Sequence, residues 1–233
     1  MLGNHGRSVA TVIFTPFAKL LARIGVTPNM VTYGSAVIVA GLSFGLLARG
    51  YLGLGGILLG VVLFADSVDG VLSRLTGTSS KYGAFLDSTM DRITDGMVFG
   101  SLLWWAIVGL PDGAIRTTTI VAGIVSMVAI GVVPYTRARA ENFGVIAKVG
   151  IAERTDRLII VLVGAGFTDF GLPEVLFPIG MVWVAFASCV TVIQRMVVAQ
   201  RALAGAGLEQ PCTWVASIAS LAAFFHTPRP PRL

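Results

Sequence analysis

The chain has 233 residues, of which 55% are hydrophobic and only 12% are charged, and its mean hydropathy is +0.83. This composition excludes an ordinary soluble domain and indicates a membrane protein that crosses the bilayer several times. The net charge of +5 does not indicate a nucleic-acid partner, because the basic residues are scattered at the ends of apolar segments. Anionic lipids and phosphorylated substrates suit this charge better.

Segment lengths predict an all-α polytopic membrane protein, with one membrane domain over residues 1–200 and a cytoplasmic tail over 201–233. Residues 8–24 mix apolar residues with Lys19 and Arg23, as an amphipathic helix at the membrane interface would. Thr27 and Pro28 then supply the start of a helix. Six apolar segments follow, and each is expected to be a transmembrane helix: 30–48, 50–73, 85–110, 115–139, 155–170 and 174–198.

The basic residues predict the orientation of these segments. If all six segments span, Arg49 and Arg116 lie on one side of the membrane, and the other fifteen of the 17 lysines and arginines lie on the opposite side. The positive-inside rule then places both termini and the loop between the second and third spans in the cytoplasm. The expected location is therefore the cell membrane, with a cytoplasmic active site.

Five aspartates stand where the second span ends and the third begins. Asp66 and Asp69 are three residues apart, whereas Asp87, Asp91 and Asp95 recur every fourth residue and so share one helix face. The uncharged stretches of these two spans are each about 24 Å long at about 1.5 Å per residue. A hydrocarbon core is about 30 Å thick, so the aspartates must complete the spans. Carboxylates at this depth are costly and indicate a functional site.

The residue types around the aspartates suit a phosphorylated nucleotide. Four hard oxygen donors on two facing helix ends favour Mg²⁺, with Mn²⁺ as the alternative. Gly70 and Gly83 leave room for a nucleotide close to the backbone, and Arg74 offers a fork for a phosphate oxygen. A cation transporter is a remote alternative, because it would hold its carboxylates near the membrane midplane on broken helices.

The stretch from residue 66 to residue 91 reads DSVDGVLSRLTGTSSKYGAFLDSTMD. It resembles the signature of the CDP-alcohol phosphotransferases, D-x2-D-G-x2-A-R-x8-G-x3-D-x3-D, with Ser73 at the alanine position. The resemblance implies metal binding by Asp66, Asp69, Asp87 and Asp91, and binding of CDP-diacylglycerol by Asn29, Gly70, Ser73, Arg74 and Gly83. It also implies that Asp91 completes the metal site or takes the proton of the acceptor. Asp95 lies outside the signature, as a structural partner or as part of the acceptor site.

The acceptor must be read from basic residues elsewhere in the chain. The candidates for an acceptor phosphate are Arg137, Arg154 and Arg195, followed by Lys148 and Arg157, although many such residues merely follow the positive-inside bias. The stretches TPNMVT, KYGAFLDSTMDRITDG, SLLWW, RARAE and ERTDRLIIVLVGAG resemble the actinobacterial phosphatidylinositol phosphate synthases. That resemblance implies inositol 1-phosphate as the acceptor and a homodimer. Phosphatidylglycerophosphate synthase, which uses glycerol 3-phosphate, is the alternative.

Overall fold

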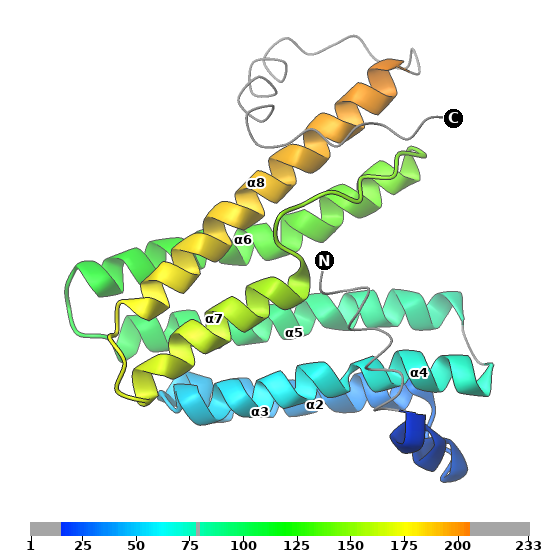
Figure 1. Cartoon of the computed structure of the whole chain (residues 1–233), viewed down its shortest axis with the longest axis horizontal. Helices are drawn as coiled ribbons and strands as arrows, with labels where there is room; N and C mark the ends of the chain where they lie inside the picture. The colour runs from blue at the N-terminus through cyan, green and yellow to red at the C-terminus, as the bar shows by residue number, and fades with distance from the viewer. Residues whose placement is uncertain (1–14, 78–79, 206–233) are drawn as a thin grey trace.

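The structure is a computed structural model that describes residues 15–77 and 80–205, apart from the side chains of Ser67, Asp69, Arg74 and Thr76. This described part is helical and contains no strand, which confirms the predicted all-α class (Figure 1). Its elements are α2 (Pro28–Gly45), the 3-10 turn η1 (Leu47–Arg49), α3 (Leu52–Ala65), α4 (Ser67–Thr76), α5 (Lys81–Val108), α6 (Ala114–Asn142), α7 (Arg154–Asp169) and α8 (Leu176–Gly205).

Local sequence signals explain where the helices that carry the aspartates begin and end. The Thr27 side chain accepts a hydrogen bond from the Met30 N–H and caps α2, as predicted, with Pro28 in the first turn. Ser80 caps α5 in the same way, since its hydroxyl accepts from the Gly83 N–H at 2.9 Å. Helix α4 ends at Gly77, whose φ of +64° suits a residue without a side chain. The turn between α4 and α5 is therefore short.

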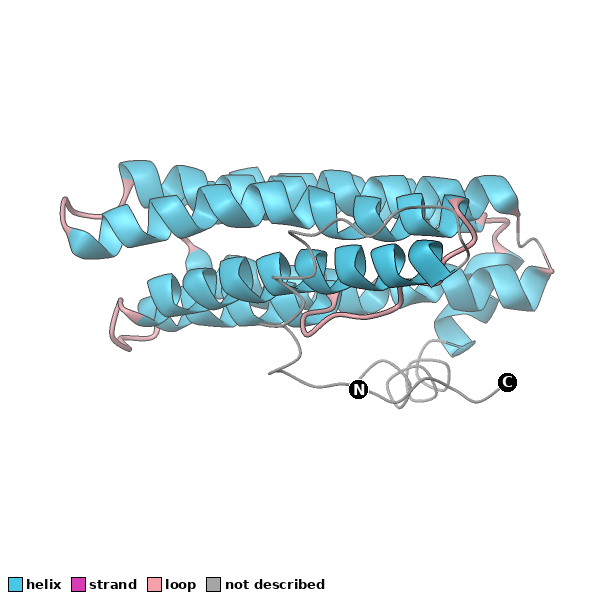
Figure 2. Ribbon diagram, turned by 90° about the horizontal axis from the view of Figure 1, so that it is seen from above, coloured by secondary structure: helices cyan, strands magenta, loops and turns pink. Residues whose placement is uncertain are grey.

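The six long helices form a closed ring in which each packs against two neighbours. Helix α2 packs against α3, α3 against α7, α7 against α8, α8 against α6, α6 against α5, and α5 against α2. Figure 1 shows α2, α3 and α5 side by side, α7 and α8 inclined to them, and α4 continuing α3 at one end, and Figure 2 shows the same bundle from above. Large buried side chains such as Phe99, Leu102, Phe177 and Met181 fill the apolar part of this bundle. The ring encloses a space that polar groups can share.

Several boundaries differ from those predicted. Helix α5 begins at Lys81, four residues before the predicted 85, because Ser80 caps it there. The predicted span 50–73 is divided at Asp66, which separates α3 from α4. Helix α8 continues to Gly205, seven residues beyond the predicted 198. The aspartates of the third span therefore lie inside a regular helix and not in a turn.

The start of the chain follows the prediction in part. Residues 15–23 are helical, and the buried Ala18 packs against Val68, Val71 and Leu72 of α4. Residues 8–14 of the predicted interfacial helix lie outside the described residues, as does the tail from 206. The short N-terminal helix thus contacts the protein near the end of the bundle that carries α4 (Figure 1).

Four helical stretches of the described chain are long and apolar enough to cross a membrane: Pro28–Arg49, Leu52–Ser73, Ala114–Asn142 and Leu176–Gly205. Their length and composition are those of a membrane protein. Four such stretches are fewer than the six spans that the sequence predicts. Helix α7 has only 16 residues, and α5 carries Asp87, Asp91, Arg92 and Asp95 between its start and its midpoint region. Both helices nevertheless stand in the ring with the other four.

We predict that Gly56→Ala destabilises the protein and that Gly60→Ala on the same helix does not. A Cβ at Gly56 would lie 3.2 Å from the Leu162 carbonyl oxygen of α7, whereas a Cβ at Gly60 would meet nothing within 4 Å. Overpacking costs about 1–3 kcal/mol, whereas an unhindered alanine restricts the unfolded chain and is mildly stabilising. Thermal unfolding in detergent measures both variants, and equal midpoints would contradict this close contact between α3 and α7.

Candidate metal centre

Three of the predicted metal-binding aspartates come together in the structure. Asp66 lies between α3 and α4, and Asp87 and Asp91 lie one turn apart on α5. One carboxylate oxygen from each lies within 4.8 Å of the other two. Hard oxygen donors at this spacing fit a divalent cation such as Mg²⁺ or Mn²⁺. Asp66, from the first of the two acidic faces predicted from residue spacing, therefore lies opposite Asp87 and Asp91 of the second.

The remaining signature residues surround this cluster or lie outside what is described. The side chains of Asp69 and Arg74 are among those that the structure does not describe, although their backbone belongs to α4. A Cβ added at Gly70 would meet nothing within 4 Å, so this part of α4 faces open space. Ser73 is only half-buried, and its hydroxyl donates to the Gly70 carbonyl oxygen at 3.2 Å. Room for a ligand beside α4 is therefore present where the glycine predicts it.

Gly83 and Asn29 meet at the start of α5. A Cβ at Gly83 would lie 3.4 Å from Asn29 Oδ1 and 3.2 Å from the Ser80 hydroxyl that caps the helix. The amide of Asn29 thus reaches from the first turn of α2 to the first turn of α5. Asn29, which the resemblance assigns to donor binding, therefore lies beside Gly83 of the signature.

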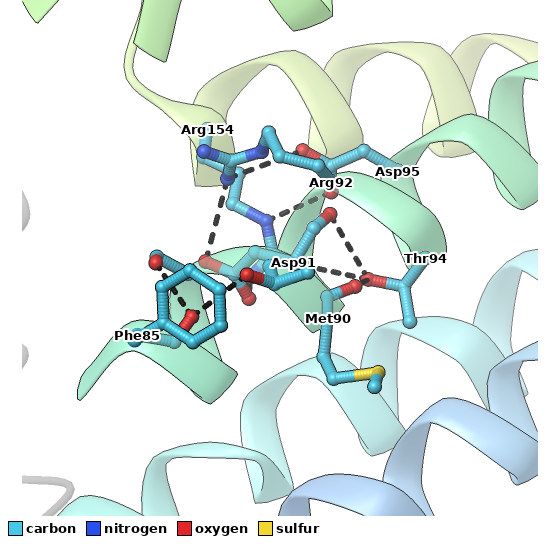
Figure 3. Close-up of polar contacts among 9 residues, drawn as sticks. Phe85, Met90, Asp91, Arg92, Thr94, Asp95 and Arg154 are labelled. Atoms are coloured by element: carbon cyan, nitrogen blue, oxygen red, sulfur yellow. Dashed lines mark hydrogen bonds and ion pairs between the residues drawn. The ribbon is translucent and has the colours of Figure 1, made fainter. Parts of the chain in front are cut away.

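Arg154 links the acidic cluster to α7 (Figure 3). Its Nη1 lies 2.8 Å from Asp91 Oδ1, and its Nε donates to Asp95 Oδ1 at 2.8 Å. Its Nη2 also donates to the Thr94 hydroxyl at 3.2 Å. One side chain from α7 is thus held by three residues of a single α5 surface. Of the basic residues assigned to the acceptor, Arg154 is the one placed directly beside the aspartates.

Asp95 is the most buried member of this network, with 2% of its side chain exposed. Besides Arg154, it contacts Arg92 Nη2 at 3.7 Å, and the same Arg92 nitrogen lies 3.4 Å from Asp91 Oδ2. A buried carboxylate needs such partners, because an unpaired charge in this environment costs several kcal/mol. Of the two roles left open by the sequence, the contacts support the structural one, in which Asp95 holds Arg154 and Arg92.

Of the other predicted acceptor residues, Arg157 is the one that interacts with an aspartate of α5. Its electrostatic partners are Asp95, Arg92, Arg195 and Arg154, and Arg195 in turn interacts with Arg137. Arg157 is only 3% exposed, and its Nη1 has no hydrogen-bond partner within the described part of the chain. Lys148 is exposed. The four arginines are thus connected in succession by electrostatic interactions.

Two members of this series already have partners. Arg195 Nε donates to the Val149 carbonyl oxygen at 2.9 Å, and its Nη1 donates to the Val133 carbonyl oxygen. Arg195 thus ties α8 to α6 and to the connection before α7. Arg137 Nε pairs with Glu141 at 2.8 Å on the exposed end of α6. Nearby, the guanidinium of Arg139 lies 4.7 Å from the ring centroid of Phe143.

An apolar groove opens beside the acidic cluster, between α3 and α7. It has a volume of about 370 Å³ and is lined mostly by apolar residues, with Arg154 and Thr155 at one end and Phe170 at the other. Gly53, Gly56 and Gly60 form part of its wall, and α7 with the residue that follows it lies close to Gly53 and Gly56. Because Arg154 belongs to both, the groove and the acidic cluster adjoin each other.

Ser35 of α2 is a site residue that sequence reasoning missed. Its hydroxyl donates to Asp66 Oδ1 at 2.7 Å, across 31 residues of sequence. Thr94, also missed, accepts from Arg154 and donates to backbone carbonyl oxygens of its own helix. Both residues lie outside the signature, and nothing in their spacing could have indicated these contacts.

The fold and the site together define a helical membrane protein with a carboxylate centre for a divalent metal and an adjoining apolar groove. The family model for CDP-alcohol phosphatidyltransferases matches residues 25–228. The chain is 39% identical over 199 residues to a phosphatidylinositol phosphate synthase of Corynebacterium glutamicum, covering 85% of this chain and 89% of that one. Identity to the synthase of Streptomyces avermitilis is 41% over 209 residues, or 86% of this chain and 83% of the other.

Solved structures agree with these sequence relatives. The phosphatidylinositol phosphate synthase of Mycobacterium tuberculosis with CDP-DAG bound matches with a TM-score of 0.75 at 36% identity, covering 80% of this chain and 93% of that one. The same protein in complex with manganese and citrate matches with a TM-score of 0.75 at 36% identity, covering 80% and 88%.

The chain therefore belongs to the CDP-alcohol phosphatidyltransferase family and is a transferase of phospholipid synthesis, which confirms the resemblance found in the signature. Its acidic cluster and the manganese in that relative indicate an enzyme that depends on a divalent metal. This assignment replaces the alternative of a cation transporter.

We predict that Asp95→Asn lowers the free energy of unfolding by about 3 kcal/mol, because it removes the most buried counter-charge of Arg154 and Arg92 and leaves both with the partly exposed Asp91 alone. Asp112→Asn is the matched control, since Asp112 pairs with Arg116 on α6 while its own side chain is 93% exposed. Removing an exposed pair costs at most about 1 kcal/mol. Unfolding curves in detergent compare the two variants, and a similar small loss in both would contradict a structural role for Asp95.

Proposed function

We propose that this enzyme transfers the phosphatidyl group of CDP-diacylglycerol to inositol 1-phosphate, with phosphatidylinositol phosphate and CMP as products. The observation that carries the choice of a phosphorylated acceptor is the buried Arg157. This side chain is 3% exposed, its Nη1 has no hydrogen-bond partner among the described residues, and it interacts electrostatically with Asp95 and with Arg92, Arg154 and Arg195. A phosphomonoester would offset this excess of positive charge, whereas a neutral alcohol would not. The names of the relatives support inositol phosphate as that acceptor.

The donor lipid fits the two regions that adjoin Arg154, namely the apolar groove and the acidic cluster. An acyl chain lies in the apolar groove between α3 and α7, and the pyrophosphate lies at the acidic cluster beside Arg154. Gly70 leaves open space for the nucleotide beside α4, whereas Asn29 and the Ser80 hydroxyl take up the space beside Gly83. The parts of Arg74, Ser73, Gly83 and Asn29 in donor binding follow from the resemblance alone. This arrangement lets a lipid remain in the membrane while its headgroup reacts at the edge.

The metal ion of this centre is Mg²⁺, with Mn²⁺ as a substitute. Asp66, Asp87 and Asp91 would hold it, together with Asp69 by its place in the signature. When bound, the cation offsets the charge of the pyrophosphate and makes its phosphorus more electrophilic. The carboxylates converge from α5 and from the junction of α3 and α4, so the protein supplies most of the required geometry before substrate arrives.

The reaction is an in-line displacement at the β-phosphorus, which carries the diacylglycerol. A hydroxyl oxygen of the acceptor forms a bond to this phosphorus, the bond to the oxygen that bridges the two phosphates breaks, and CMP leaves with that oxygen. Asp91 accepts the hydroxyl proton, and Arg154 holds its carboxylate in position at 2.8 Å. Arg157 and Arg195 orient the acceptor phosphate, and Arg137 and Lys148 add positive charge at its entrance.

All six helices of the ring cross the membrane in this proposal, including the short α7 and the charged α5. Neighbouring helices would shield their polar residues from lipid. The start of α6 and the connection from α2 to α3 lie at the end of the bundle opposite α4 (Figure 1). Arg116 and Arg49 belong to these segments and would mark the outer side, so that the acidic cluster would face the cytoplasm. Residues 15–23 would lie at the inner interface. Assembly as a homodimer stays a prediction from the resemblance alone.

We predict that Asp91→Asn lowers CMP release by at least about 10²-fold, because the acceptor proton loses its base and the metal loses a ligand. Release of CMP from CDP-diacylglycerol in detergent, with Mg²⁺ and inositol 1-phosphate, measures the effect. Asp112→Asn serves as the control. Turnover by Asp91→Asn near that of the unmodified enzyme would overturn the assignment of Asp91.

We predict that turnover requires a phosphorylated inositol. The enzyme is offered inositol 1-phosphate, inositol or glycerol 3-phosphate separately, each with CDP-diacylglycerol and Mg²⁺, and the lipid product is identified by mass spectrometry. Only inositol 1-phosphate should yield product at a substantial rate, because both the ring and the phosphate are needed for binding. Turnover with glycerol 3-phosphate alone would identify a phosphatidylglycerophosphate synthase, and equal turnover with free inositol would remove the role of the arginines.

A further inference from the structure

Asp66 differs from the other carboxylates of the centre in the way it is held. Asp87 and Asp91 project from the regular helix α5, whereas Asp66 stands at the interruption between α3 and α4. The position of Asp66 relative to α5 therefore depends on how α3 and α4 pack against the rest of the bundle. Helix α2 lies between these two halves, because it packs against α3 and α4 on one side and against α5 on the other.

Ser35 is the side chain of α2 that contacts Asp66. The serine hydroxyl carries one proton, and two acceptors are within reach of it: the Thr32 carbonyl oxygen at 3.0 Å in the same helix, and Asp66 Oδ1 at 2.7 Å. The carboxylate is the stronger acceptor, and 2.7 Å is typical of a hydroxyl that donates to a charged oxygen. The usual contact of a helical serine with its own backbone is therefore accompanied by a shorter bond to the junction of α3 and α4.

We propose that Ser35 is a positioning residue for the metal centre. By donating to Oδ1 of Asp66, it fixes the rotation of the carboxylate and leaves Oδ2 and the second lone pair of Oδ1 for the cation. The inference rests on the proposed role of the acidic cluster as a metal site. Groups that hydrogen-bond to a metal ligand commonly change metal affinity by about 10–100-fold when removed.

The same helix also reaches the other half of the centre. Asn29 of α2 lies beside Gly83 in the first turn of α5, so α2 contacts both elements that carry the aspartates. A bond from Ser35 to Asp66 therefore sets one carboxylate relative to a helix that is itself packed against α5. The consequence is a centre whose oxygen atoms are close together before any cation binds.

Binding of Mn²⁺ to the detergent-solubilised full chain tests the inference without relying on turnover. The free Mn²⁺ signal in electron paramagnetic resonance gives the dissociation constant. We expect Ser35→Ala to raise this constant about tenfold and Ser35→Thr, which keeps the hydroxyl, to restore it within about threefold. Ser43→Ala is the matched control, because Ser43 is a buried serine of the same helix whose hydroxyl has no partner among the described residues. It should bind Mn²⁺ as the unmodified chain does.

A further arm separates failure of this inference from failure of the proposed function. If the unmodified chain binds Mn²⁺ and Asp66→Asn does not, the metal centre stands, and unchanged binding by Ser35→Ala would then overturn the role of Ser35 alone. If the unmodified chain does not bind Mn²⁺, both proposals fail. At saturating metal, Ser35→Ala should recover most of its kcat with unchanged KM values for both substrates. A loss of thermal stability without a change in Mn²⁺ affinity would show that Ser35 serves packing only.

Discussion

The bridge that Arg154 makes from α7 to α5 is the interaction on which the site depends. Asp91 and Asp95 lie in a helix whose surroundings are largely apolar, where an unpaired carboxylate is costly. The guanidinium contacts both at 2.8 Å and has planar geometry suited to holding two acceptors at once. Helix α7 also forms one wall of the apolar groove. The contacts of Arg154 with α5 therefore hold the groove next to the acidic cluster.

A closed ring of helices explains how charged side chains can be held within an apolar bundle. Each helix covers its neighbours, so polar side chains can point into the ring while apolar ones face outward. Within the ring, charge changes sign over a short path, from the aspartates of α5 through Arg154 to the buried Arg157 and on to Arg195. A metal with a pyrophosphate at the acidic end and a phosphomonoester at the basic end would complement this distribution.

The sequence predicted the acidic cluster well because helix geometry links spacing to position. Residues four apart share one face, so Asp87 and Asp91 had to lie together wherever α5 packed. The arginines were predicted less well. Arg154 is held by aspartates, and Arg195 by backbone carbonyl oxygens of α6 and of the connection before α7. These partners are remote in the sequence, and no local pattern indicates them.

By itself, then, the sequence determined the helical class, the membrane setting, the family signature and the faces that carry the aspartates. All of these follow from composition and from spacing within single segments. Only the tertiary structure decided that Ser35 contacts Asp66, that Asp95 is a buried ion-pair partner, and that two glycines of α3 lie close to α7 beside a groove. The physical reason is that such contacts depend on which helices become neighbours, and packing of the whole ring sets this.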